Sequence, residues 1–252
     1  MRTLAQKNIL VTGGSRGLGL GLVEALVARD ARVTVVARDA QALKAVRDRL
    51  GVATVAADVT DAEAARRLVG EIAPDVLVLN AGAIPPMGRI DRIAWADFAA
   101  TWESDVRAGL FWVQAALTRP LAPGARVLLG SSGAAINGSP LSGGYAGAKR
   151  MLWVMAKYAN ALSQQQGLGI RFQAIVPLQM VAGTGVGEAG AAGYAQASGI
   201  TSAAFLSRFP AMTPRQFGEQ VAALLADPAH DDGLAFGIKG GAPVAVLEGA
   251  AA

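Results

Sequence analysis

Cysteine is absent from the 252 residues of this chain. Disulfide bonds, thiolate nucleophiles and zinc sites built on thiolates are therefore excluded. Histidine occurs once, as His230, in the polar stretch Asp-Pro-Ala-His-Asp-Asp-Gly, which is typical of a surface turn. A hydrolase with a Ser-His-Asp triad is disfavoured because no other histidine could serve as its base. A single loop histidine is far more often solvated than bound to a metal ion, so we expect no metal site.

Long apolar runs are also missing. No window supplies the roughly 20 uninterrupted apolar residues that span a bilayer, and the first residues lack the apolar core of a signal peptide. We therefore expect a cytoplasmic protein with no membrane partner. Charged residues make up only 17% of the chain, the net charge is +4, and like charges form no block. Although the isoelectric point is about 9.8, a nucleic-acid partner is therefore not expected.

Short apolar runs alternate with helical patterns along the chain, in which 52% of residues are hydrophobic. The apolar runs are continuous rather than alternating, which is typical of parallel strands covered by helices on both faces. The pattern predicts an α/β fold with a doubly wound parallel sheet in a single domain, residues 1–252. Strands are expected over residues 8–13, 32–38, 52–59, 75–82, 125–132, 169–177 and 234–239. Helices are expected over residues 19–30, 39–51, 95–119 and 145–166, and from residues 60 and 213 onward.

Some helix boundaries carry specific signals. Thr60 and Glu63 have the spacing of a capping box, Pro120 should stop the long helix that precedes it, and Thr213 with Pro214 should open the last helix. In a doubly wound sheet, ligands bind beyond the carboxyl ends of the strands. The residues that directly follow the strands are therefore the candidates for function.

A glycine-rich loop, Thr-Gly-Gly-Ser-Arg-Gly-Leu-Gly, follows the first strand. Gly13, Gly17 and Gly19 would allow a tight turn, close approach of a pyrophosphate, and access to the free N–H groups of the next helix. The alternative is a glycine-rich turn without a ligand. The position between a strand and a helix in a βαβ unit favours nucleotide binding.

Arginine follows the second strand, where an NAD site usually carries an acid. Arg38 there and Arg16 in the glycine loop could both grip a 2′-phosphate, which favours NADP(H) over NAD(H). Asp39 keeps NAD(H) open, and both arginines could be ordinary surface residues.

Polar residues follow the next three strands. Asp58 could accept a hydrogen bond from the adenine amino group or could simply begin the next helix. Asn80 could tie neighbouring strands together, and Ser132 would bring a hydroxyl to the same edge of the sheet.

Tyr145 and Lys149 are four residues apart, and on a helix they share one face. Chance is the simplest explanation of such a pair. The alternative is a tuned acid, in which the ammonium group favours the ionised phenol.

Taken together, these motifs resemble the short-chain dehydrogenase/reductase family. The glycine loop, Asp58-Val59, Asn80-Ala81-Gly82, Ser132 and Tyr145-x-x-x-Lys149 occur in the family's order and spacing, over nearly the whole chain. The resemblance implies a single Rossmann domain that moves a hydride between a nicotinamide cofactor and a carbonyl or alcohol. The cofactor-binding residues that it implies are Gly13, Ser15, Arg16, Gly17, Leu18, Gly19, Arg38, Asp58, Val59, Asn80, Ala81, Gly82, Tyr145, Lys149, Pro177 and Thr184.

The resemblance also assigns catalytic roles. Tyr145 would be the general acid in carbonyl reduction and the base in alcohol oxidation. Lys149 would support the phenolate and hold the nicotinamide ribose, and Ser132 would hydrogen-bond the carbonyl oxygen. Asp105 stands where the family commonly has asparagine. It could preserve the relay water bound near its main-chain carbonyl, could raise the pKa of Lys149, or could be an ordinary helix acid.

The segment after Pro177 departs from the family, which usually has Pro-Gly there. Thr184 is displaced from the family's carboxamide-binding threonine, and residues 178–212, rich in glycine and alanine, are expected to form a mobile substrate loop or else a disordered surface loop. The glycine-rich closing motif near the last strand is only partly matched. In the family that region often forms a subunit interface, and the resemblance implies a homodimer or homotetramer.

The substrate pocket should draw on residues 83–88, 133–138 and 178–181, which are mostly apolar or small. A neutral, fairly apolar small-molecule carbonyl compound or alcohol fits such a pocket better than a sugar acid. The competing function is a nucleotide-binding or redox-sensing protein of the same fold that does no chemistry; the intact Ser132, Tyr145 and Lys149 argue against it.

Overall fold

The computed structural model describes residues 1–119 and 121–249. Eight strands in this part of the chain form one sheet in the order β3-β2-β1-β4-β5-β6-β7-β8, and only β8 runs antiparallel to its neighbour. The bounds are β1 Asn8–Thr12, β2 Arg32–Ala37, β3 Ala53–Ala56, β4 Val76–Leu79, β5 Arg126–Gly130, β6 Arg171–Pro177, β7 Ala235–Ile238 and β8 Ala245–Glu248. The predicted fold class is confirmed, and β8 is an element that the sequence pattern did not predict.

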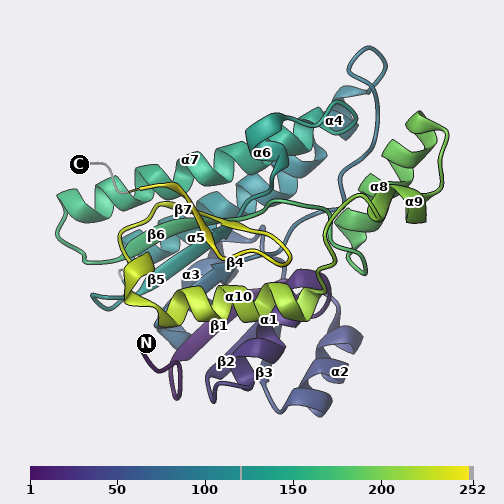
Figure 1. The fold of residues 1–252 in the computed structure, drawn as a ribbon. Helices are drawn as coiled ribbons and strands as arrows, with labels where there is room; N and C mark the ends of the chain where they lie inside the picture. Colours follow the sequence, from purple (N-terminus) through teal and green to yellow (C-terminus); the bar gives the residue numbers. More distant parts are fainter. Residues whose placement is uncertain (120, 250–252) are drawn as a thin grey trace.

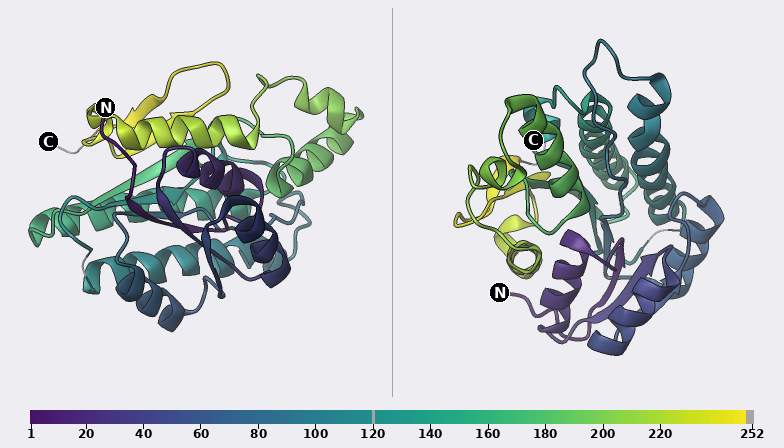
Figure 2. Two further views of the ribbon diagram at one scale, coloured as in Figure 1. Left: turned by 90° about the horizontal axis from the view of Figure 1, so that it is seen from below. Right: turned by 90° about the vertical axis from the view of Figure 1, so that its right-hand side faces the viewer.

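Helices cover both faces of the sheet, as Figures 1 and 2 show. The core under α1, α2 and α10 is separate from the core under α3, α5 and α7. In β1, the adjacent residues Leu10 and Val11 are both fully buried, and they enter different cores. This explains the continuous apolar strands. The helices are α1 Gly17–Val27, α2 Ala40–Leu50, α3 Ala62–Ile72, α4 Trp95–Thr101, α5 Arg107–Thr118, α6 Ala134–Asn137, α7 Gly143–Gln165, α8 Gly185–Ser198, α9 Ser202–Leu206 and α10 Pro214–Ala226.

Two of the helix boundaries can be compared directly with their signals. Thr213 begins α10 with a complete capping box and Pro214 in the first turn, as predicted. The expected cap at Thr60 is wrong, because the N–H and hydroxyl of Thr60 both donate to Asp58 at 2.9 and 2.8 Å. Asp61 caps α3 instead. The expected stop at Pro120 lies outside the described residues.

Two segments differ in conformation from what was expected. The helix expected over residues 95–119 is interrupted by a π-helical turn, Trp102–Val106, between α4 and α5. Residues 178–212 do not form an irregular loop, since most of them belong to α8 and α9, which stand beyond the end of the sheet at the right of Figure 1. No helix in the described ranges is both long and apolar enough to cross a membrane.

Candidate active site

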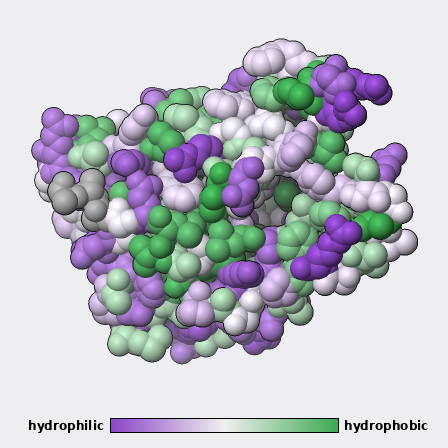
Figure 3. All heavy atoms as spheres, turned by 45° about the horizontal axis from the view of Figure 1, so that its top comes forward, coloured by the Kyte–Doolittle hydropathy of each residue, from purple (hydrophilic) through white to green (hydrophobic). Residues whose placement is uncertain are grey.

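A cavity of about 840 Å³ opens at the carboxyl end of the parallel strands, beside the adjacent strands β1 and β4, from which the chain continues into opposite halves of the sheet. Figure 3 shows the surface hollowed, with apolar side chains in green around and inside the hollow. Of the predicted site residues, only Gly19 does not line it. Those that do are Gly13, Ser15, Arg16, Gly17, Leu18, Arg38, Asp58, Val59, Asn80, Ala81, Gly82, Asp105, Ser132, Tyr145, Lys149, Pro177 and Thr184.

The glycine loop is shaped by two close approaches of the backbone. Gly13 has φ +67°, and a Cβ there would lie 2.7 Å from the Cα of Ala81. A Cβ at Gly19 would lie 2.3 Å from the carbonyl oxygen of Gly13. Arg16 precedes α1 without a capping hydrogen bond from its side chain. The N–H groups at the start of α1 therefore remain available to an anion such as a pyrophosphate.

Thr12, which the sequence interpretation missed, fixes the loop after β4. Its hydroxyl accepts hydrogen bonds from the N–H groups of Asn80 and Ala81, at 3.1 and 3.2 Å. The side-chain amide of Asn80 donates to the carbonyl of Gly13 at 3.3 Å. Asn80 thus ties β4 to β1. The available signal was a threonine that ends an otherwise aliphatic strand.

Arg16 and Arg38 are both exposed at the cavity, and neither forms an ion pair within residues 1–119 and 121–249. Asp39 caps α2, because its carboxylate accepts hydrogen bonds from the N–H groups of Gln41 and Ala42, both at 3.0 Å. The pKa of Asp58 is lowered, first by the N–H of Thr60 and also by the nearby charge of Arg38. The two guanidinium groups are therefore the groups best placed for an extra phosphate.

Lys149 is buried on α7 beneath the cavity. Its Nζ lies 3.0 Å from Oδ2 of Asp105, donates to the carbonyl of Gly130 at 3.2 Å, and lies 5.6 Å from the ring centroid of Tyr145. Burial alone would lower the pKa of Lys149, but the carboxylate of Asp105 and the phenol of Tyr145 outweigh it and raise that pKa. The ammonium form is thus maintained beside the tyrosine.

Asp105 is held by the π-helical turn. Its Oδ1 accepts from the N–H of Ala83 at 2.8 Å and from the hydroxyl of Ser104 at 2.7 Å, which leaves Oδ2 for Lys149. A π turn is a common feature of functional sites because it redirects one side chain of a helix. Asp105 is therefore a partner of Lys149 and not an ordinary helix-surface acid.

The two serines after β5 have different contacts. Ser131 donates to the main-chain carbonyl of Lys149 at 2.8 Å, which joins β5 to α7. The Ser132 oxygen accepts from the N–H of Ala134 at 3.2 Å, so its proton remains available. In the part of the chain that the structure describes, the hydroxyl of Tyr145 makes no hydrogen bond. Ser132 and Tyr145 thus bring two hydroxyl protons to one cavity.

The hydroxyl of Thr184 has a local role. It donates to the carbonyl of Val181 at 2.8 Å and accepts from the N–H of Gly187 at 3.0 Å, capping α8. Thr184 lines the cavity as expected, but its hydroxyl is engaged in this cap.

Several cavity residues were not singled out from the sequence. They are polar and aromatic side chains beyond the expected pocket segments: Ser139, Ser142, Tyr194, Phe205 and Phe209. The signal that could have found the aromatic ones is their isolation in a segment otherwise rich in glycine and alanine.

Comparison with known proteins bears directly on this site. A model of short chain dehydrogenases matches residues 7–191. The chain belongs to the short chain dehydrogenase family. The predicted family is confirmed.

Relatives of this short chain dehydrogenase carry diverse names. The chain is 34% identical to short chain dehydrogenase/reductase AacuD of Aspergillus aculeatus over 57% of its length and 54% of that protein. It is 32% identical to a galactitol 2-dehydrogenase (L-tagatose-forming) of Cereibacter sphaeroides, over 66% of this chain and 68% of that protein. It is 35% identical to human L-xylulose reductase, over 42% of this chain and 43% of that protein. The match thus spans only about half of some relatives.

Solved structures with the same fold cover more of the chain. A short chain dehydrogenase from Burkholderia cenocepacia in complex with NADP matches with a TM-score of 0.75 and 27% identity, over 94% of this chain and 97% of that one. A 3-ketoacyl-(acyl-carrier-protein) reductase from Brucella melitensis complexed with NADH matches with a TM-score of 0.77 and 19% identity, over 94% and 98%. The second likeness concerns the fold alone.

Proposed function

We propose that this short chain dehydrogenase is a carbonyl reductase that prefers NADPH and acts on a neutral, fairly apolar substrate. The observation that carries the proposal is the buried pair of Lys149 and Asp105 beneath Tyr145, in one cavity with Ser132. A buried lysine that has a counter-charge, a neighbouring phenol and a cavity in one place is a candidate functional group. The same cavity contains the glycine loop, so a nucleotide and a substrate could meet there.

The residues present fit a nicotinamide dinucleotide. The backbone at Gly13 and Gly19 leaves no room for side chains, and the start of α1 offers N–H groups to the pyrophosphate. Arg16 and Arg38 would hold a 2′-phosphate. When bound, the cofactor supplies the hydride.

The protein's own part in the reaction is to handle the proton and the developing charge. As the substrate carbon gains a C–H bond, the C=O electron pair moves onto oxygen, and the phenol of Tyr145 gives that oxygen its proton. Ser132 donates a hydrogen bond to the same oxygen. The resulting phenolate is stabilised by the Lys149 ammonium, and solvent restores the proton.

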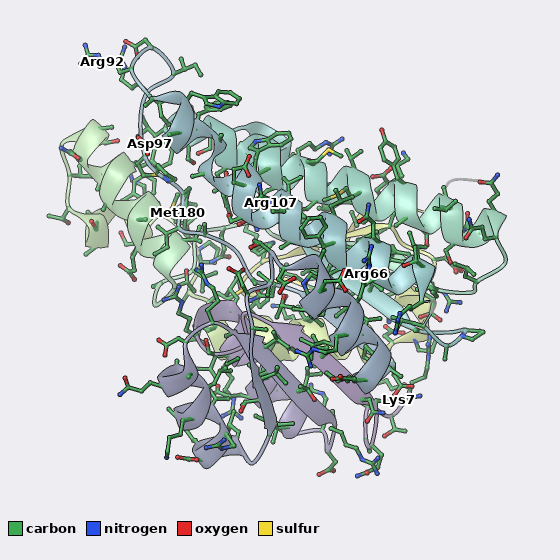
Figure 4. The ribbon with its side chains drawn as sticks, turned by 180° about the vertical axis from the view of Figure 1, so that it is seen from behind. Lys7, Arg66, Arg92, Asp97, Arg107 and Met180 are labelled. Atoms are coloured by element: carbon green, nitrogen blue, oxygen red, sulfur yellow. The ribbon has the colours of Figure 1, made fainter. Side chains whose placement is uncertain are left out.

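The cofactor preference can be tested with Arg38→Ala. A lost charge-assisted hydrogen bond of about 1.5–3 kcal/mol should raise the Kd of NADPH roughly ten- to hundredfold. The Kd of NADH should change little, because NADH has no 2′-phosphate. Arg92→Ala is the matched control, since Arg92 lies at the tip of a loop away from the cavity (Figure 4). Equal losses for both cofactors would refute the preference, and NADPH binding without turnover of any carbonyl compound would favour a non-catalytic sensor.

The proposal extends to the surroundings of the site. We propose that residues 178–212 move on substrate binding, and that the protein is a homo-oligomer of the cytoplasm. Hydrogen exchange of α8 with and without NADPH and a ketone tests the movement of residues 178–212. Sedimentation of the purified protein tests whether it is a homo-oligomer.

A further inference from the structure

Three aromatic side chains from residues 178–212 line the same cavity as the catalytic residues: Tyr194 on α8, Phe205 on α9, and Phe209 just after it. The rings of Tyr194 and Phe205 are stacked, 5.7 Å apart and 10° from parallel. Phe209 meets Phe205 edge-on at 5.8 Å. We call these three residues the aromatic wall. The whole chain has only seven phenylalanines and three tyrosines, so the wall concentrates a scarce residue type at one place.

Methionine side chains meet the same helix. A Cβ at Gly193 would lie 2.7 Å from Cε of Met87, and one at Gly190 would lie 3.0 Å from Cε of Met180. Both methionines line the cavity, and Met180 lies at the base of α8 in Figure 4. Gly190 and Gly193 of α8 thus leave room for two thioethers that line the same cavity as the aromatic wall. Thioethers pack well against aromatic rings.

A chain of hydroxyl groups anchors the aromatic wall to the start of α7, the helix that carries Tyr145. The Tyr194 hydroxyl lies 2.6 Å from that of Ser139, which lies 2.6 Å from that of Ser142. The N–H of Leu141 also approaches the Tyr194 oxygen, at 3.4 Å. Gly190 and Gly193 lie in the interior of α8, where a glycine weakens a helix by about 1 kcal/mol relative to alanine. Contacts such as these therefore matter for holding α8 in place.

We propose that the aromatic wall selects substrates whose carbonyl group is attached to an aromatic ring, and that Tyr194 positions the wall over the site. This inference rests on the proposed carbonyl reductase function. A planar ring can stack or meet edge-on with the wall and touch Met87 and Met180. A sugar would instead place hydroxyl groups against the apolar faces of these side chains, at about 1–3 kcal/mol for each hydroxyl left without a partner. This chain therefore differs in substrate from its relatives that are named for sugars and polyols.

The test uses 1-phenyl-1,2-propanedione and 2,3-pentanedione, two diketones that differ in a phenyl or ethyl group, with NADPH. Wild type should show a kcat/KM about ten- to hundredfold higher for the phenyl compound, since ring contacts add to the burial of extra apolar area. Phe205→Ala should reduce this ratio at least fivefold, mainly through KM. An unchanged ratio in Phe205→Ala, or no preference in wild type, would overturn the inference.

Tyr194 is tested by two variants. Tyr194→Phe keeps the ring but loses the hydroxyl contacts, so KM should rise about two- to tenfold for both diketones while kcat and the phenyl preference persist. Tyr194→Ala should also lose the preference. Tyr158→Phe, at an exposed position of α7, should match wild type. Unchanged KM values in Tyr194→Phe would overturn the positioning role.

The outcomes separate this inference from the proposed function. Reduction of both diketones without a preference would leave the carbonyl reductase standing and refute the aromatic wall. If neither diketone is reduced, the reductase proposal fails for these substrates, and calorimetric binding decides the inference. Tighter binding of the phenyl compound that is lost in Phe205→Ala would support it, and equal binding would refute it.

Discussion

Two buried cations lie at opposite ends of strand β5, and they are held in opposite ways. Arg126 is the first residue of β5, and Lys149 donates to the carbonyl of Gly130, its last residue. Arg126 gives hydrogen bonds to Gln173 at 2.6 and 2.9 Å and to the carbonyl of Leu225 at 3.2 Å. Burial, the largest influence, lowers its pKa to about 10, because the charge of Asp231 offsets only part of the desolvation.

Lys149 has a closer counter-charge and fewer neutral acceptors. Asp105 lies 3.0 Å away, and the pKa of Lys149 is raised in spite of burial. Among the described residues, its Nζ donates to a single backbone carbonyl, that of Gly130, and a cavity opens beside it. Arg126 thus links helix to sheet mainly through neutral acceptors, with Asp231 as a more distant counter-charge, whereas Lys149 has a close counter-charge and lies beside a cavity.

The strongest way to sharpen this comparison is Tyr145→Phe. The ring still fills its place next to Lys149, but the proton donor is gone, so ketone reduction should fall about 10²–10⁴-fold while NADPH binding and thermal stability stay close to wild type. Steady-state kinetics, fluorescence titration and calorimetry check the three quantities, with Tyr158→Phe on the same helix as control. Activity within tenfold of wild type would remove Tyr145 from the role of acid.

Arg126→Met should lower the stability of the protein and leave its activity nearly unchanged, the reverse of Tyr145→Phe. It leaves the buried oxygen of Gln173 without its donor and removes the hydrogen bond to the carbonyl of Leu225, which should cost about 3 kcal/mol of unfolding free energy. The kcat per folded molecule should hardly change. Arg32→Met, at the exposed first residue of β2, should cost less than about 0.5 kcal/mol. Denaturant unfolding measures the loss of stability, and activity measured on the folded fraction gives the kcat per folded molecule. A loss of kcat at unchanged stability would contradict the structural role of Arg126.

The smallest effect is expected from Asp105→Asn, within the Lys149 site itself. The Asp105 carboxylate favours the ammonium form of Lys149 but opposes a negative charge on the phenol, so removing it should shift the pH midpoint of alcohol oxidation downward by up to about one unit. The asparagine oxygen can still accept from Lys149, so the maximal rate should persist. Glu103→Gln, in the same π turn but exposed, should leave the midpoint unchanged. An unchanged midpoint in Asp105→Asn would show that its charge does not reach the phenol, and a collapse of the rate would show that the charge itself is required.

The sequence was a good guide wherever the physical cause is local. Continuous apolar strands, Gly51 with φ +68° after α2, and the capping box at Thr213 depend on a few neighbouring residues. The spacing of Tyr145 and Lys149 fixed their common helix face. Because parallel strands end at one edge, the order of motifs along the chain also brought the site residues to one cavity.

Competing contacts decided the rest. Thr60 has a good local signal for a helix cap, but Asp58, two residues before it, engages its N–H and hydroxyl, and Asp61 caps the helix instead. Asp105 meets Lys149 only because a π turn redirects it, and the glycine-rich residues of α8 are helical in a structure that packs Met87 and Met180 against them. The sequence alone determined the doubly wound sheet and the edge where chemistry belongs, since periodicity and glycine conformations are properties of short segments. Which counter-charge Lys149 receives and which side chains face a substrate depend on packing between residues far apart in the chain, and only the tertiary structure decided them.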